Sequence, residues 1–199
     1  LTRDGRVVVF HDRALRRLTG ARGRIEDCDV ADLRGLRLLR TSQRIPLLAE
    51  VLALVDGRVP LLVELKAGAP PTALEAAVLD ALRGYRGEVA IQSFELRTVR
   101  ELDRREAPHA IGRLWRRRTV PAPGERVAFV GCHVDGVPRR AIRRRREAGA
   151  VVLAWTVRSP EQAERALRFV DNYIFEGFVP ELPAAHPLIA PESARRAAR

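Results

Sequence analysis

Short hydrophobic runs alternate with amphipathic stretches over most of the chain after residue 58. Six of these runs have the length and apolar content of buried strands: residues 60–66, 88–93, 109–114, 127–133, 150–156 and 172–175. The stretches between them carry apolar residues at helical spacing and predict helices over residues 72–83, 95–105 and 138–147, and one that Ser159 caps, with Pro160 at its first position. Strands that alternate with helices over such short connections predict a parallel sheet with helices packed against it.

The region before residue 58 is less regular. Residues 13–29 are polar and lack periodicity, so we expect a loop there, followed by a short helix that Asp29 or Asp32 caps. Residues 45–56 keep helical spacing and predict a helix that ends at Gly57.

Two architectures accommodate this order of elements: an open, doubly wound α/β sheet, or a TIM (β/α)8-type barrel that lacks its first two strands in this chain. The Asp4-Gly5 turn precedes the apolar run 7–10, which predicts a strand, and such a turn ordinarily joins two strands. No strand precedes the turn, so we favour the incomplete barrel and expect an exposed sheet edge beside residues 60–66. The chain also has no Met and starts at Leu1, from which we expect the native N-terminus to lie upstream.

In a barrel of this type the functional residues lie at the carboxyl ends of the strands. Polar or aromatic side chains occupy several of these ends: Glu64, Lys66, Gln92, Ser93, His133, Trp155, Thr156 and Glu176. We expect residues 1–180 to form the incomplete barrel, with residues 13–45 as an inserted loop region and residues 181–199 as a disordered tail.

The most informative of these strands ends with Leu61-Leu62-Val63-Glu64-Leu65-Lys66. Side chains alternate along a strand, so Glu64 and Lys66 point to the same face. Two charges at the end of an apolar strand are costly unless they meet each other, a metal or a charged ligand. Lys66 is the only lysine among the 36 basic residues, which favours a role for a compact ammonium group. A simple ion pair at the strand end remains the alternative.

Composition adds a strong positive charge. The chain carries 36 Lys and Arg against 25 Asp and Glu, a net charge of +11. A polyanionic partner is therefore an alternative to catalysis: a non-catalytic, Arg-rich barrel that binds nucleic acid or anionic lipid. The arginines of residues 143–146 lie in a predicted helix, where successive side chains point in different directions, so we favour a solvated basic surface over a nucleic-acid site.

Other features of the sequence bear on disulfides, structural metals and the cellular compartment. The two cysteines show no metal-binding spacing, which argues against a disulfide scaffold and a structural zinc. No apolar run is long enough to span a membrane, and no signal peptide is visible. We favour a cytoplasmic protein, with export left open. The sequence does not indicate an oligomeric state.

Several motifs together resemble those of glycerophosphodiester phosphodiesterases. They are Thr2-x-Asp4-Gly5-x-Val7-x-x-x-His11-Asp12, Ile45-Pro46-x-Leu48-x-Glu50-Val51-Leu52, Val63-Glu64-Leu65-Lys66, Gln92-Ser93-Phe94 and Ala154-Trp155-Thr156-Val157. The resemblance covers nearly all of residues 2–180, and the spacing from the His-Asp pair to the Glu-x-Lys strand is its most specific part. It implies a (β/α)8 barrel that hydrolyses glycerophosphodiesters to an alcohol and glycerol 3-phosphate with a divalent metal, Ca2+ or Mg2+.

Carried over to this sequence, the resemblance implies catalytic roles for His11, as an acid/base, and for Lys66, as a phosphate contact, with Glu64 as a metal ligand. The first His-Arg-Gly of the family and its Glu-x-Asp pair have no counterpart here, so we expect this chain alone to be inactive. The last strand also departs from the family, because Glu176-Gly177 replaces the usual Thr-Asp.

We also expect Gln92, Phe94, His133 and Trp155, at or next to the carboxyl ends of their strands, to bind the substrate. Each has a plainer alternative: a core or turn role for Gln92 and Phe94, a structural imidazole for His133, and barrel filling for Trp155. Asp12 could orient His11 or hold its loop.

Overall fold

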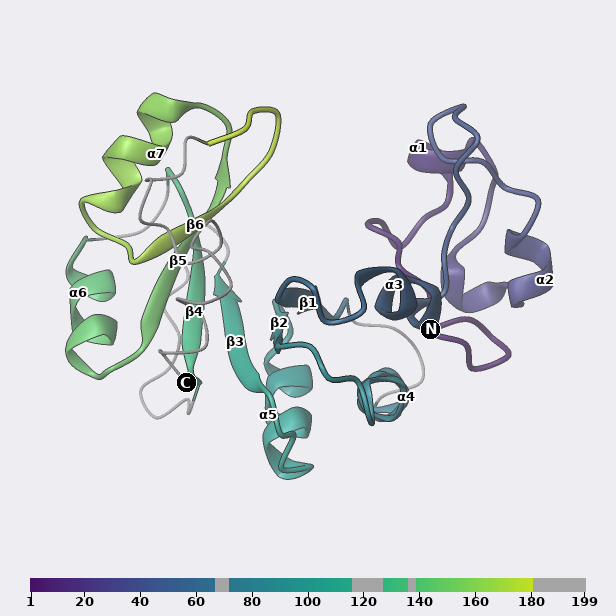
Figure 1. Ribbon diagram of the computed structural model, residues 1–199, viewed down its shortest axis with the longest axis horizontal. Helices are drawn as coiled ribbons and strands as arrows, with labels where there is room; N and C mark the ends of the chain where they lie inside the picture. The colour runs from purple at the N-terminus through teal and green to yellow at the C-terminus, as the bar shows by residue number, and fades with distance from the viewer. Residues whose placement is uncertain (67–71, 116–126, 136–138, 181–199) are drawn as a thin grey trace.

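The computed structural model describes residues 1–66, 72–115, 127–135 and 139–180 (Figure 1). The N-terminal part contains only helical elements: α1 (Arg16–Thr19), a 3-10 helix (Ile25–Asp27), α2 (Val30–Leu33) and α3 (Leu48–Val55). From there the strands are β1 (Leu61–Glu64), β2 (Val89–Ser93), β3 (Ala110–Trp115), β4 (Phe129–His133), β5 (Val151–Val157) and β6 (Asn172–Phe175). The helices between them are α4 (Ala73–Leu82), α5 (Leu96–Arg104), α6 (Arg139–Glu147) and α7 (Pro160–Leu167).

All six strands form one parallel sheet in the order β1-β2-β3-β4-β5-β6. This confirms the alternating pattern, because each predicted strand and helix after residue 58 is present within a few residues of its expected bounds. Figure 1 shows the sheet curled, with α5, α6 and α7 on its outer side. A closed TIM barrel has eight strands, so the described residues form an open part of one, with β1 and β6 as its edges. The expected sheet edge at residues 60–66 is thus present.

Strand alternation separates the two faces of the sheet. Leu61, Val63 and Leu65 pack with helix residues such as Val78 in one hydrophobic core. Leu62, Glu64 and the side chains in register with Glu64 therefore face the inside of the curl. A second hydrophobic core lies between the strands β4 to β6 and the helices α6 and α7, and includes the buried Val130, Val152 and Val157.

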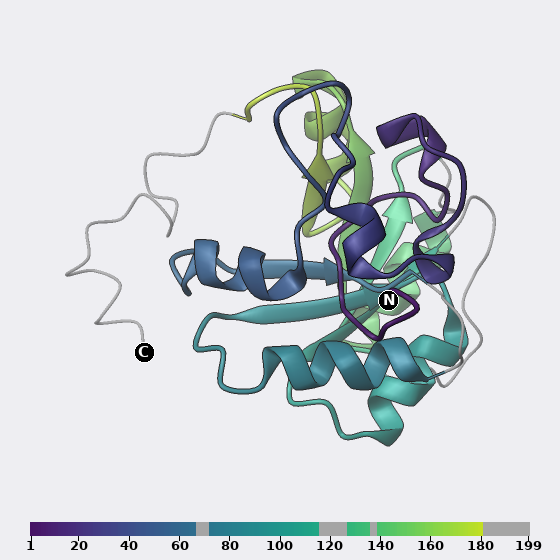
Figure 2. The ribbon, with the colours of Figure 1, turned by 90° about the vertical axis from the view of Figure 1, so that its right-hand side faces the viewer.

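The residues before α3 form a small lobe beside β1, seen in front of the sheet in Figure 2. Leu15, Ile25 and Leu33 make a separate core there. The turn at Asp4-Gly5 forms the start of this lobe. The buried Thr2 donates its hydroxyl to Asp4 Oδ1 at 2.6 Å and accepts from the Arg6 N–H at 2.9 Å.

Two expectations for this lobe are wrong. Residues 7–10 do not form a regular strand, because their only ladder contact is an antiparallel bridge from Val8 to Leu47. Two backbone hydrogen bonds flank this bridge: the Val9 N–H donates to the Pro46 carbonyl, and the Leu48 N–H donates to the Val7 carbonyl. Residues 13–29 are not a loop throughout, because they contain α1 and the 3-10 helix. The short helix after Asp29 is confirmed, and Asp32 Oδ2 accepts a hydrogen bond from the Asp29 N–H at 2.9 Å.

The arginines of α6 diverge as the helical geometry predicts. Arg143 approaches Glu147 at 3.7 Å, Arg146 pairs with Asp171 at 2.8 Å, and Arg145 lies over the ring of Trp115. Opposite charges thus partly balance the cluster, in agreement with a solvated basic surface. The arginines at 116–118 and the tail from residue 181 lie outside the described residues.

Within the part of the chain that the structure describes, no helix has the length and hydrophobicity needed to cross a membrane.

We expect Gly112→Ala to destabilise the fold, because a Cβ at this inward-facing position of β3 would lie 2.1 Å from the ring of Phe129 in the neighbouring strand. Overpacking of this kind costs about 1–3 kcal/mol. Chemical denaturation measures the effect against Gly35→Ala, where the added Cβ would meet nothing within 4 Å. Equal stability of the two variants would contradict the packing described for the interior of the sheet.

Candidate active site

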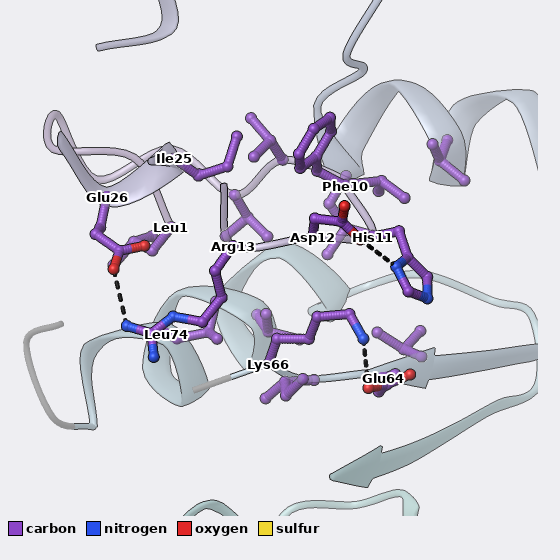
Figure 3. Close-up of a pocket in the computed structure, with 18 of the residues that line it drawn as sticks. Leu1, Phe10, His11, Asp12, Arg13, Ile25, Glu26, Glu64, Lys66 and Leu74 are labelled. Carbon is purple, nitrogen blue, oxygen red and sulfur yellow. Dashed lines mark hydrogen bonds and ion pairs between the residues drawn. The ribbon is translucent and has the colours of Figure 1, made fainter. Parts of the chain in front are cut away.

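A cavity of about 550 Å³ lies between β1 and the N-terminal lobe. Most of its lining is apolar, contributed by residues 7–10, α3, β1 and α4. Its charged and titratable lining residues are His11, Asp12, Arg13, Glu26, Glu64 and Lys66. Figure 3 shows them around the mouth of the cavity, with Glu64 and Lys66 on the strand side and His11 and Asp12 on the lobe side.

Glu64 and Lys66 form an ion pair, with Lys66 Nζ at 2.6 Å from Glu64 Oε1. Strand alternation places both side chains on the inner face, and each is only partly exposed, at 26% and 31%. The pair is therefore both the predicted strand-end ion pair and part of a cavity wall. Within the described part of the chain the second oxygen of Glu64 accepts no hydrogen bond, which leaves it available to a ligand.

Across the cavity mouth, His11 is held by Asp12. Its Nδ1 lies 2.6 Å from Asp12 Oδ1. A carboxylate can only accept, so this contact assigns the proton of neutral His11 to Nδ1 and leaves Nε2 as the basic nitrogen. The ring itself is 73% exposed. Asp12 thus orients His11, one of the two roles considered from the sequence.

Arg17 of α1 binds the same carboxylate with two nitrogens. Its Nε lies 2.5 Å from Asp12 Oδ2, and its Nη2 lies 2.6 Å from Oδ1. The hydrogen bonds from Arg17 and then from His11 hold the pKa of Asp12 far below its ordinary value. Asp12 is therefore an anion throughout the neutral range.

A second ion pair closes the other end of the charged lining. Arg13 Nη2 lies 2.9 Å from Glu26 Oε1. Burial acts to raise the pKa of Glu26, but the hydrogen bond from Arg13 and nearby positive charge outweigh it, and the pKa lies below its ordinary value. In Figure 3 this pair and the Glu64–Lys66 pair flank the mouth, so the cavity presents charge at its entrance above an apolar interior.

The other four predicted site residues lie on the inner wall but do not line this cavity. Trp155 makes edge-to-face contacts with Phe94 at 5.2 Å and with His133 at 5.0 Å between ring centroids. His133 Nδ1 also accepts the Asp135 N–H at 3.2 Å. His133 also lines a separate cavity of about 240 Å³ between the ends of β4 and β5 and the helices α6 and α7, on the outer side of the sheet. The sequence analysis assigned these four residues to the same site as Glu64 and Lys66. The structure places none of them in the lining of that cavity, and His133 lines another one.

Gln92 lies next to the cavity wall, because it is the register partner of Glu64 in the neighbouring strand. It is only 5% exposed, and its Oε1 accepts no hydrogen bond from the described residues. The indole N–H of Trp155 is likewise buried without a partner there. Buried polar atoms of this kind ordinarily find a partner, which makes both side chains candidates to contact a ligand.

The described residues do not form a complete metal centre. Nowhere in residues 1–66, 72–115, 127–135 and 139–180 do three His, Cys, Asp or Glu side chains come close enough together to hold a metal ion. On the strand side of this cavity, Glu64 offers a carboxylate whose second oxygen lies outside its ion pair with Lys66, whereas Arg17 binds both oxygens of Asp12. One carboxylate suits a hard cation but falls short of the six or so oxygen ligands that such an ion takes.

The sequence analysis identified neither Arg17 nor the ion pair between Arg13 and Glu26. The signals were weak: Arg17 lies in a four-residue helix within a polar stretch, and a contact across the turn between residues 13 and 26 leaves no periodic trace. Glu50, which belongs to one of the motifs, caps α3, because its Oε2 accepts a hydrogen bond from the Leu47 N–H at 2.7 Å.

A parallel α/β barrel sheet with a charged cavity at its strand ends defines a barrel enzyme of the TIM type. Residues 1–175 match the glycerophosphoryl diester phosphodiesterase family, and the chain belongs to that family. Comparison with curated proteins gives no match.

Solved structures of phosphodiesterases share this fold. An Oleispira antarctica phosphodiesterase in complex with the product sn-glycerol-3-phosphate is 21% identical, with a TM-score of 0.80 over 88% of this chain and 77% of that one. The glycerophosphodiester phosphodiesterase of Thermotoga maritima is 25% identical, with a TM-score of 0.71 and the same coverage. The predicted TIM-type fold and family are thus confirmed.

We expect Asp12→Asn to destabilise the chain in a pH-dependent manner. The folded pKa of Asp12 is lowered, so its stabilising contribution is fully present above the unfolded pKa of about 3.9 and is lost as pH falls towards the folded value. The difference in free energy of unfolding between the natural chain and the variant should be constant above pH ~5 and shrink below pH ~4.

The matched control is Asp103→Asn, because Asp103 forms no side-chain ion pair within the described residues. Urea denaturation from pH 3 to pH 7 measures both variants. A difference for Asp12→Asn that does not change with pH would show that its carboxylate is not held by Arg17.

Proposed function

We propose that this protein hydrolyses glycerophosphodiesters to an alcohol and glycerol 3-phosphate, in a reaction that depends on a divalent metal. The observation that carries the proposal is that His11, Glu64 and Lys66, drawn from two separate segments, line one cavity at the end of β1. Family membership supports the same reaction, and a phosphodiesterase of the same fold was solved in complex with the product sn-glycerol-3-phosphate.

Lys66 would bind the phosphoryl group. Hydrolysis of a phosphodiester builds negative charge on the phosphoryl oxygens, and a fixed ammonium group stabilises that charge in the transition state. Its pairing with Glu64 at 2.6 Å supports this role, because the carboxylate holds Nζ at the cavity wall. A phosphate at the mouth would share or replace this contact.

His11 would act as a general acid or base. Its Nδ1 is committed to Asp12, so Nε2 is the nitrogen that can take or give a proton. The exposure of the ring supports access to a nucleophile or a leaving alcohol at the cavity mouth.

A divalent cation, Ca2+ or Mg2+, would supply charge neutralisation at the phosphate, with Glu64 as one of its ligands. The described residues do not complete its coordination, so we assign no other ligand. Gln92, Phe94, His133 and Trp155 would contact the substrate from the inner wall. The buried Gln92 Oε1 and Trp155 indole N–H, which have no hydrogen-bond partner among the described residues, support this.

We expect Lys66→Ala to lower kcat by about 100- to 1,000-fold, the usual effect of losing one group that stabilises transition-state charge. Turnover of a glycerophosphodiester by the longest chain that the gene encodes measures this effect. Arg83→Ala is the matched control, because it also removes an ion pair to a nearby carboxylate, at 2.9 Å, on the exposed side of α4. Undiminished turnover in Lys66→Ala would remove Lys66 from the mechanism.

We expect residues 1–199 alone to show little or no hydrolysis with either Ca2+ or Mg2+. The reason is the incomplete set of cation ligands among the described residues. Glycerol 3-phosphate release and calorimetric titration with each metal measure activity and binding. Robust metal-dependent turnover by this chain, or micromolar binding of the metal, would contradict the proposal of an incomplete centre.

A further inference from the structure

We propose that Arg17 is a positioning residue for His11, acting through Asp12. Its guanidinium fixes the Asp12 carboxylate, and this carboxylate fixes the orientation and the tautomer of the imidazole. The consequence for catalysis rests on the proposed function, whereas the consequence for His11 itself does not.

The three side chains form a continuous chain of short contacts. Arg17 reaches both oxygens of Asp12, through Nε at 2.5 Å and Nη2 at 2.6 Å. Asp12 Oδ1 then lies 2.6 Å from His11 Nδ1. A carboxylate gripped at both oxygens cannot rotate about its terminal bond, so its Oδ1 stays directed at the imidazole.

Arg17 is itself held in place by the backbone of α1. Leu15, just before the helix, is 1% exposed and anchors the lobe core. The Leu39 N–H donates to the Leu18 carbonyl at 2.7 Å, and the Thr19 hydroxyl donates to the Leu15 carbonyl at 2.8 Å. The helix therefore presents the guanidinium from a fixed base, although the helix is only four residues long.

His11 needs this support because nothing else in the described part of the chain bonds to its ring. Its recorded polar partners are Asp12 and, at 3.4 Å, Arg17 Nη2. The ring is 73% exposed, so packing does not restrain it. Without Arg17, Asp12 could turn towards solvent and His11 would lose its tautomer and its direction.

The first experiment is NMR on residues 1–199, which needs no turnover. At pH 8.5, ¹⁵N shifts of the imidazole report which nitrogen carries the proton. We expect His11 to be protonated at Nδ1 in the natural chain and to become a mixture of tautomers in Arg17→Ala. Arg17→Lys, which offers one point of charge instead of a two-nitrogen grip, should restore part of the Nδ1–H population.

Arg16→Ala is the matched control, because Arg16 lies in the same short helix, is exposed and forms no ion pair within the described residues. It should leave the His11 spectrum unchanged. A His11 spectrum that is the same in Arg17→Ala as in the natural chain would overturn the proposal. If Arg17→Ala does not fold, Arg17→Lys and Arg17→Gln decide the question in the same way.

Kinetics on the longest chain that the gene encodes then test the catalytic consequence. We expect Arg17→Ala to lower kcat by about 10- to 100-fold, the scale of a misplaced catalytic group, with KM within twofold. An inactive natural protein with the expected NMR change would reject the proposed function and leave the positioning role standing. An unchanged kcat in an active protein with the NMR change would reject the catalytic consequence.

Discussion

The ion pair at the carboxyl end of β1 sets the character of the whole site. Lys66 Nζ and Glu64 Oε1 lie 2.6 Å apart on the inner face of an otherwise apolar strand. Strand alternation turns both side chains inward and Leu65 outward into the core. Two charges are thus held at a cavity wall by the same packing that stabilises the strand, so a change in register would remove them from the cavity.

The N-terminal lobe forms the opposite wall of the cavity and is stabilised by different interactions. Its core is three buried side chains, and its helices have three or four residues each before α3. Turns, ion pairs and hydrogen bonds therefore do much of the ordering: the Thr2–Asp4 hydroxyl contact, the Arg13–Glu26 pair and the Arg17–Asp12 pair. His11 lies at the end of this polar network and faces the Glu64–Lys66 ion pair of the sheet. The network explains why an exposed imidazole can still have a defined orientation.

The sequence predicted the sheet well because its signals are local. Apolar runs of strand length, separated by stretches at helical spacing, predicted the six strands of the parallel sheet, and the shared side of Glu64 and Lys66 followed from alternation alone. The strand predicted over residues 7–10 is not formed, because a strand requires a partner and this apolar run pairs only briefly with residues 46–48. The contact of Arg17 with Asp12 could not be predicted, since it depends on the bends of the backbone between these residues, which leave no periodic pattern in the sequence. The substrate contacts predicted for His133 and Trp155 remain predictions, because neither side chain lines the cavity that holds Glu64 and Lys66.

The central claim is that an imidazole from the lobe and an ammonium group from the sheet serve one phosphodiester between them. A double-mutant cycle with His11→Ala and Lys66→Ala, measured as kcat/KM on the longest chain that the gene encodes, tests it most directly. Two groups that act on the same transition state are strongly non-additive, so the double variant should be little worse than the poorer single variant. Effects that multiply as for two independent sites would contradict the account.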